Sequence, residues 1–303
     1  MTAMDVFYWL FNMSIAAAIT GVPVMLLRQI KRLPRRLSVF LWLIPFCRMV
    51  IPVGLASPYG LMSLISQVTG KTVVVFQSGE DVAFSAVNFT MAADQYFPIT
   101  YKSTVLERVF TVATAIWLVA ALAILLTLAV LYFTTLRELK DAKHLRRNIW
   151  LSDKITTPAV YGILRPRIIL PAFYKDTELI LLHEKAHIRR GDNLWRIAGF
   201  CTAAVHWFNP LSWVFLKLFL EDLELACDEC VLAKLDDAQK KAYAMTLLAC
   251  QEQTNVFASA FGGASVRTRI ENILSFKKMT AFSFVVFLTL MTVIFYVLLT
   301  NAG

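Results

Sequence analysis

Four long apolar stretches constrain the fold of this chain more than any other feature of its sequence. Each is long enough to cross a bilayer, which takes about 20 apolar residues in a helix. They cover Met4–Leu27, Leu37–Ala56, Val109–Phe133 and Thr280–Thr300. The first carries Asp5, lacks a basic start and is followed by no cleavage site, so we expect a retained span rather than a signal peptide. Because 58% of its 303 residues are hydrophobic, the chain is expected to be a mainly α integral membrane protein.

Basic residues at the ends of the spans predict the orientation, because cytosolic loops carry an excess of lysine and arginine. Such residues follow the first stretch, follow the third stretch and precede the fourth. In that order they are Arg28, Lys31, Arg32, Arg35 and Arg36; Arg137, Lys140, Lys143, Arg146 and Arg147; and Lys277 and Lys278. The loop Ser57–Arg108 holds far fewer. We expect residues 1–133 to form three spans with an outer loop at 57–108, residues 134–279 a cytosolic domain, and residues 280–303 the fourth span. Both termini would then lie outside.

The net charge of +9 largely reflects the same bias. A nucleic-acid-binding chain would also be basic, but here the basic clusters adjoin the ends of the spans. We therefore expect the chain to be embedded in the lipid bilayer and to bind no nucleic acid directly.

The sequence His183-Glu184-Lys185-Ala186-His187 has the pattern H-E-x-x-H. Its neighbours favour a helix, and helical residues four apart share one face, so the two imidazoles can bind one zinc ion. Zinc lowers the pKa of a bound water to about 7, and Glu184 could take the proton of that water as general base. The pattern predicts a zinc peptidase, although five residues alone are weak evidence.

A third ligand is supplied by Glu224 in the later segment Glu221–Val231, since a catalytic zinc takes three protein ligands and an open position. Asp228 follows four residues later on the same helical face. It could accept a hydrogen bond from the far nitrogen of a ligand histidine and so fix the ring. The alternative is that Glu224 and Asp228 lie on a surface helix and simply face water. Glu221 is a rival candidate for the third zinc ligand.

Other candidate residues have simpler structural explanations. His206 could stabilise an oxyanion but is expected to be a buried or interfacial histidine. Cys227 and Cys230 have redox or structural-zinc spacing, but their separation on a helix suits core packing. Arg48, a charge within the second span, is a functional candidate by default.

The remaining segments predict a mixed α and β domain. Thr157–Pro171 reads as a hairpin or two short strands, and Leu136–Arg147 as a helical extension of the third span. The apolar runs Leu194–Phe208 and Leu211–Leu220 are split by Pro210, so two core helices that touch the membrane surface are expected rather than a fifth span.

Taken together, these residues resemble the BlaR/MecR-type antirepressor metallopeptidases, which are integral-membrane zinc peptidases of bacteria. The matching blocks are Thr157–Gly162 with Pro166–Pro171, His183–His187 with Arg190 and Asp192, Trp207–Pro210 with Trp213, and Glu224–Asp228. The resemblance covers essentially the whole chain. It implies a gluzincin-like α+β zinc-metallopeptidase domain between spans three and four, held in the bacterial plasma membrane.

The resemblance also implies zinc ligands at His183, His187 and Glu224, with Glu184 as the base. The expected activity is hydrolysis of a cytosolic protein, a transcriptional repressor at the level of the family, in signal transduction linked to antibiotic resistance. Members also cleave themselves, and Ser275–Phe276 is the bond expected here. The sequence ends at Gly303, three residues past the fourth stretch, so it is either a fragment of a longer protein or a member without the penicillin-binding sensor domain. For a member of the second kind, a separate sensor protein or a homodimer is the expected partner.

Two further functions compete with this prediction. A quality-control membrane metalloprotease would also carry H-E-x-x-H with a later glutamate, but the Thr157–Pro171 and Trp207–Pro210 blocks disfavour it. A non-catalytic receptor or scaffold could retain the peptidase fold, and the intact ligands with Glu184 disfavour that alternative.

Overall fold

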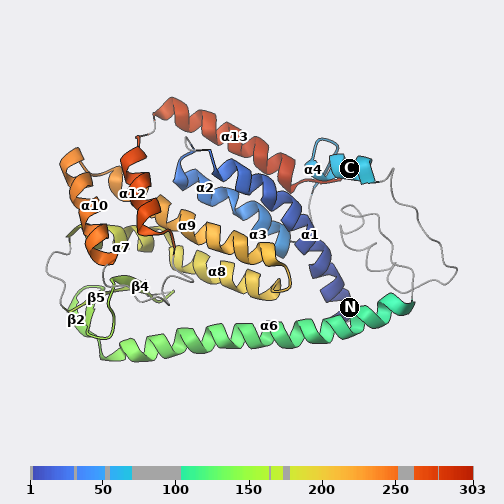
Figure 1. The fold of residues 1–303 in the computed structure, drawn as a ribbon, viewed down its shortest axis with the longest axis horizontal. Coiled ribbons are helices and arrows are strands. Elements are labelled where there is room, and N and C mark those ends of the chain that lie inside the picture. Colours follow the sequence, from blue (N-terminus) through green and yellow to red (C-terminus); the bar gives the residue numbers. More distant parts are fainter. Residues whose placement is uncertain are drawn as a thin grey trace.

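The computed structural model is mainly helical, with a four-stranded sheet beyond one end of a bundle of apolar helices (Figure 1). It describes residues 3–30, 33–51, 55–69, 104–163, 165–172, 178–251, 263–278 and 280–302. The predicted outer loop at 57–108 lies for the most part outside these residues.

Three of the described helices are long and apolar enough to cross a membrane. They are α1 (Ala3–Arg28), α6 (Thr104–Glu138) and α13 (Ala281–Leu299), which correspond to the first, third and fourth predicted spans. The composition and these helices make the chain a membrane protein.

The second predicted span is not one continuous helix. It forms α2 (Arg35–Leu41) and α3 (Leu43–Val50), which meet at Trp42, and neither reaches the length of a bilayer crossing. The break has a local cause, because Pro45 has no N–H to donate to the carbonyl of Leu41. A count of four spans is therefore not confirmed.

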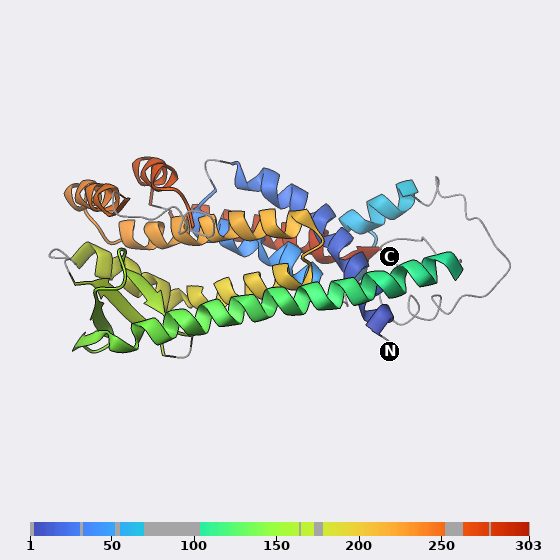
Figure 2. The same ribbon diagram turned by 60° about the horizontal axis from the view of Figure 1, so that its bottom comes forward.

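The apolar runs after the H-E-x-x-H segment form two helices, as Pro210 predicted. They are α8 (Asp192–Val205) and α9 (Pro210–Leu232), and Asn209 caps α9 by accepting the N–H of Leu211 at 3.0 Å. Figure 2 shows the pair lying alongside α1 and α6 rather than only at their end.

The tip of this α8–α9 hairpin packs between α1 and α6. Asn209 donates to the Ser14 hydroxyl at 2.8 Å, and the indole N–H of Trp117 donates to the carbonyl of Val205 at 2.8 Å. The ring of Phe208 lies 5.6 Å from that of Phe7. The tip therefore lies between two of the helices that are long and apolar enough to cross a membrane. The expectation that α8 and α9 touch the membrane surface stays a prediction.

The main hydrophobic core joins α1, α2, α3 and α9 around Trp42, Phe215 and Phe219. Gly21 permits the close approach of α1 to α9, because a Cβ there would lie 2.1 Å from the Phe215 ring. At the end nearest the sheet, the carboxylate of Asp222 on α9 accepts hydrogen bonds from α1 and α2, which holds the three helices together.

The sheet has the order β2-β3-β5-β4, with β3 and β5 parallel and the other neighbours antiparallel. The hairpin predicted in Thr157–Pro171 is confirmed by the pairing of β4 with β5. The predicted helical extension Leu136–Arg147 is wrong beyond Asp141, where the chain enters β2 and packs Leu139 and Ala142 against the sheet. The strands are β2 (Lys143–Arg146), β3 (Ile149–Ser152), β4 (Ala159–Tyr161) and β5 (Arg167–Pro171).

Helix α7 (Glu178–Arg190) carries the H-E-x-x-H sequence and packs on the sheet through Ile180 and Leu181. Its other side meets α9 and the last two helices of this end, α10 (Asp237–Gln251) and α12 (Val266–Ser275). At the opposite end of the bundle, β1 (Ala56–Ser57) pairs with β6 (Asn301–Ala302) beside α4 (Leu61–Thr69).

Candidate metal centre

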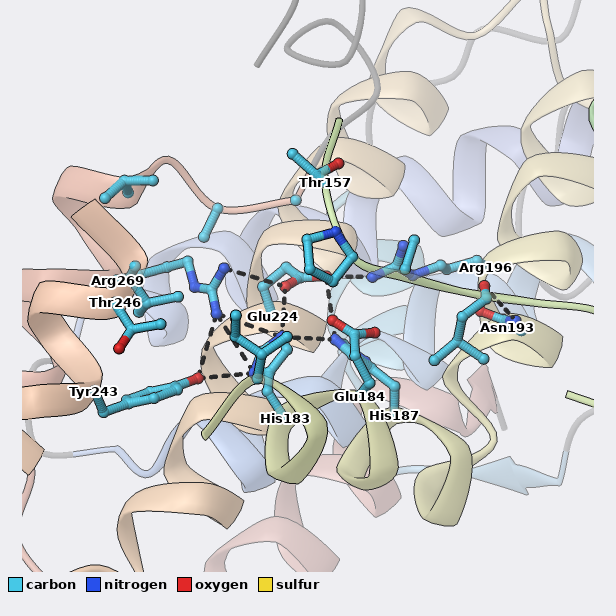
Figure 3. A pocket seen from close by; sticks show the side chains of 18 residues that line it. Thr157, His183, Glu184, His187, Asn193, Arg196, Glu224, Tyr243, Thr246 and Arg269 are labelled. Atoms are coloured by element: carbon cyan, nitrogen blue, oxygen red, sulfur yellow. Dashed lines mark hydrogen bonds and ion pairs between the residues drawn. The ribbon is translucent and has the colours of Figure 1, made fainter. Parts of the chain in front are cut away.

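A cleft of about 310 Å³ opens over α7, between the edge strand β4 and the segment that leads into α12 (Figure 3). Its floor is formed by His183, Glu184 and His187, each 7% exposed, and Glu224 enters it from α9. The structure thus brings together all four residues that the sequence singled out for chemistry.

Three of these side chains form a compact triangle of metal-ligating atoms. The Nε2 atoms of His183 and His187 lie 3.1 Å apart, and the Glu224 carboxylate places Oε2 3.6 Å from the first and Oε1 3.6 Å from the second. Ligand atoms at about 2.0–2.2 Å from a tetrahedral ion lie about 3.3–3.6 Å from one another. The triangle therefore fits a single metal ion.

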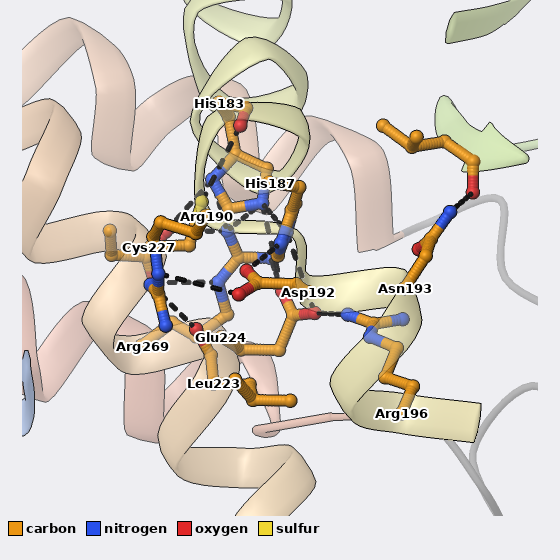
Figure 4. A network of polar contacts seen from close by, with 12 residues as sticks. His183, His187, Arg190, Asp192, Asn193, Arg196, Leu223, Glu224, Cys227 and Arg269 are labelled. Carbon is orange, nitrogen blue, oxygen red and sulfur yellow. Dashed lines mark hydrogen bonds and ion pairs between the residues drawn. The ribbon is translucent and has the colours of Figure 1, made fainter. Parts of the chain in front are cut away.

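The second nitrogen of each imidazole is held by an acceptor or hydroxyl group. Nδ1 of His187 lies 2.6 Å from Asp192 (Figure 4). Nδ1 of His183 lies 2.8 Å from the Tyr243 hydroxyl (Figure 3) and 3.3 Å from Asp228. These contacts orient both Nε2 atoms toward the centre of the triangle. The sequence anticipated the place of Asp228 beside a ligand histidine, but not that of Asp192.

Asp228 is itself fixed by two neighbours. The Tyr243 hydroxyl donates to its Oδ1 at 2.5 Å, and Arg269 donates to both oxygens at 2.6 and 2.8 Å. Burial disfavours the charged carboxylate, but Arg269 and His183 outweigh it and lower the pKa of Asp228 to about 2. Asp228 is therefore an anion that can accept the His183 proton.

Glu224 is flanked by two arginines from opposite sides of the cleft. Arg196 on α8 donates to its Oε1, and Arg269 on α12 lies 3.9 Å from Oε2. Burial opposes ionisation, yet His187 and Arg196 keep the pKa of Glu224 well below its usual value. Gly263 covers this side chain closely, since a Cβ there would lie 2.0 Å from Cγ of Glu224.

Cys227 offers a second possible ligand set. Its thiol and the two imidazoles have ligating atoms within 4.8 Å of one another. However, the thiol donates to the carbonyl of His183 at 3.4 Å and is packed in the apolar cluster of α7, α9 and α10. We therefore favour Glu224, whose oxygens complete the triangle from within the cleft.

Other residues named from the sequence lie elsewhere. Glu221 pairs with Arg28 at 2.8 Å, and His206 bonds to the carbonyl of Met49 in the helix bundle. Ser275 and Phe276 line a separate cavity rather than the cleft.

Sequence reasoning missed Arg196, Tyr243 and Arg269. Tyr243 and Arg269 are 60 and 86 residues from His183, so no local spacing could have indicated them. Asp192 had a signal, since it follows His187 by only five residues and begins the next helix, α8.

Comparison with known proteins agrees with this site. A family model described as BlaR1 peptidase M56 matches residues 8–274. The protein named Regulatory protein BlaR1 from Bacillus licheniformis is 31% identical over 138 residues, 42% of this chain and 23% of that protein. Proteins named Methicillin resistance mecR1 protein from Staphylococcus aureus and Staphylococcus epidermidis are 27% identical over 150 residues, 45% of this chain and 25% of theirs. The match thus spans about a quarter of the length of these relatives.

Proposed function

This chain belongs to the BlaR1 peptidase M56 family, and we propose that it is a membrane-embedded, zinc-dependent endopeptidase of a signal-transduction system. The observation that carries the proposal is the triangle of two imidazole nitrogens and one carboxylate with Glu184 in the same cleft. Nitrogen and oxygen ligands in this number, with one position left open, are the donor set of catalytic zinc.

His183, His187 and Glu224 would hold the ion. Zinc, when bound, lowers the pKa of water to about 7 and polarises a carbonyl group. Glu184 would accept the proton of the attacking water on its carboxylate and deliver it to the leaving nitrogen of the cleaved peptide. Asp192 and Asp228 would keep the two imidazoles in the tautomer whose Nε2 carries no proton.

The substrate we propose is a cytosolic protein, a transcriptional repressor in particular. An extended segment of such a protein would lie between β4 and the residues Gly263–Val266, which form opposite walls of the cleft. The basic residues at the ends of the spans support a cytosolic cleft, with both termini outside the plasma membrane.

Self-cleavage at Ser275–Phe276 stays a prediction. Ser275 is the last residue of α12, and its hydroxyl is bonded to the carbonyl of Glu271 at 2.9 Å. Cleavage of this bond by the same chain requires the end of α12 to unwind and leave its own cavity.

The test is a fragment assay on the full chain in bacterial membranes, with a different tag at each terminus. Wild type, Glu184→Gln and Glu224→Gln are compared with and without a zinc chelator. We expect a fragment in zinc-replete wild type only, with zinc retained at about one ion per chain in Glu184→Gln and lost from Glu224→Gln.

Glu221→Gln is the matched control, since it removes the neighbouring rival carboxylate and should retain both zinc and cleavage. Added candidate repressors are followed in the same samples. A wild-type chain that binds zinc but cleaves neither itself nor any added repressor would support the receptor or scaffold function instead.

A further inference from the structure

A second cavity lies where α13 begins, away from the metal-ligand cleft. It has a volume of about 1190 Å³ and is bounded by the residues before and at the start of α2, by the last turns of α9, by α12 and by the first turns of α13. Because α13 is one of the apolar helices long enough to cross a membrane, this cavity lies at the boundary between bilayer and water. We call it the α13 cavity.

The cavity exists because α13 is attached to the bundle mainly at its far end. There, the Arg48 guanidinium donates to the carbonyls of Leu298 and Thr300, and the hydroxyl of Tyr296 lies 2.8 Å from that of Ser57. Only 11% of the most apolar window of α13 is buried. At the near end, Ser283 and Phe287 line the cavity, and Phe287 also packs against the main hydrophobic core.

Four basic residues surround this space, namely Arg35, Arg36, Lys277 and Lys278. Two carboxylates also line it, but both already have partners. Glu229 accepts the backbone N–H groups of Arg35 and Arg36 at 2.9 and 3.2 Å, and Glu271 pairs with Arg267 at 3.0 Å.

The two lysines keep their charge available. Lys277 and Lys278 are exposed, and within the described part of the chain neither forms an ion pair. The α13 cavity therefore offers positive charge that its own carboxylates do not neutralise.

The wall beneath this charge is apolar. Leu33, Leu225 and Phe287 line the cavity together with the charged rim. A small soluble anion would use the rim and leave that apolar surface in water, at a cost of about 25 cal/mol for each Å² left exposed. A phospholipid satisfies both parts, because its phosphate is anionic and its acyl chains are apolar.

We propose that the α13 cavity binds one anionic phospholipid. The phosphate lies beside Lys277, Lys278 and Arg36, because Arg35 already pairs with Asp222 at 3.6 Å. The acyl chains run along Phe287 and the inner side of α13. Basic pockets between transmembrane helices are known to hold acidic lipid head groups. Lipid binding does not depend on peptide hydrolysis, so it is tested independently of the proposed peptidase activity.

The test is native mass spectrometry of the purified full chain, exchanged into detergent that contains either phosphatidylglycerol or phosphatidylcholine. Wild type should retain one phosphatidylglycerol in clear preference to phosphatidylcholine. The double variant Lys277→Gln/Lys278→Gln should lose about 25-fold in affinity for phosphatidylglycerol, because each basic group near an anionic lipid contributes about fivefold.

The double variant Lys143→Gln/Arg146→Gln is the matched control, since it removes the same charge from exposed positions on β2 and should bind like wild type. Ser283→Trp fills the cavity without changing any charge and should also lose the lipid. Retention of phosphatidylglycerol by both Ser283→Trp and the lysine variant would overturn the proposal. So would protection against heat by inorganic phosphate equal to that by phosphatidylglycerol, which would indicate a site for a soluble anion.

Discussion

At the scale of single residues, the candidate site depends on side chains that never touch the ion. His183 is held by Tyr243 and Asp228, and Asp228 is held in turn by Arg269. This network comes from three helices, α9, α10 and α12, which meet α7 on one side. The orientation of the His183 ring therefore depends on how α7, α9, α10 and α12 pack together.

We predict that Asp228→Asn weakens zinc binding about 10- to 100-fold, because the amide no longer supplies the anionic acceptor for the His183 proton. The measurement is competition for zinc with a chelator of known affinity. Asp237→Asn is the control, since Asp237 is exposed and pairs only with Lys240 among the described residues. Equal zinc affinity in the two variants would contradict the assigned role of Asp228.

At the scale of the helices, Asp222 is the main polar link between the bundle and α9. Its side chain is fully buried and accepts from Arg28 at 3.0 Å, from Ser38 at 2.9 Å and from the indole of Trp42 at 2.8 Å. These partners belong to α1, to α2 and to the break between α2 and α3. Glu224 follows two residues later on the same helix.

Asp222→Asn is expected to lower the free energy of unfolding by about 3–5 kcal/mol, because it leaves the Arg28 guanidinium without its buried partner. Glu221→Gln removes the more exposed partner of Arg28 and is expected to cost at most about 1 kcal/mol. Denaturant unfolding in detergent measures the free energy of unfolding of both variants. An equal decrease in the two would show that the contribution of Asp222 to stability does not depend on its burial.

Gly21→Ala tests the contact between α1 and α9. Its new Cβ would lie 2.1 Å from the ring of Phe215, which is fully buried, so the ring must move at a cost of about 1–3 kcal/mol. Phe215→Leu should recover part of that loss when combined with Gly21→Ala. Purely additive effects in a double-mutant cycle would argue against this contact.

The sequence predicted those features that depend on local spacing. His183 and His187 could be placed because helical periodicity puts residues four apart on one face. Glu224 was proposed from its position on a later helix, the arrangement of zinc peptidases whose third ligand is a glutamate. Arg196 and Arg269 could not be predicted, since they reach Glu224 from separate helices. The apolar stretch at Leu37–Ala56 predicted a span by its composition, which carries little information about the break that Pro45 introduces.

At the scale of the whole molecule, the α8–α9 hairpin joins the end that holds the cleft to the bundle. Apolar length predicted two helices but not their position between α1 and α6. That position depends on partners such as Trp117 and Ser14, which lie far away in the sequence.

We predict that Cys201 on α8, whose side chain is exposed on the protein surface, faces lipid rather than water. In a variant without the other cysteines, it should resist a charged maleimide added on either side of the membrane. Lys143→Cys in the same background is the control and should be labelled from one side. Labelling of Cys201 as fast as that of residue 143 would show that the hairpin lies outside the bilayer.

The position of Glu224 on this hairpin has a consequence for biosynthesis. The tip of the α8–α9 hairpin packs against α1 and α6, which precede it in the sequence, and Glu224 follows on the same α9. We therefore expect the proposed third ligand to reach the two histidines only after these apolar helices have packed together.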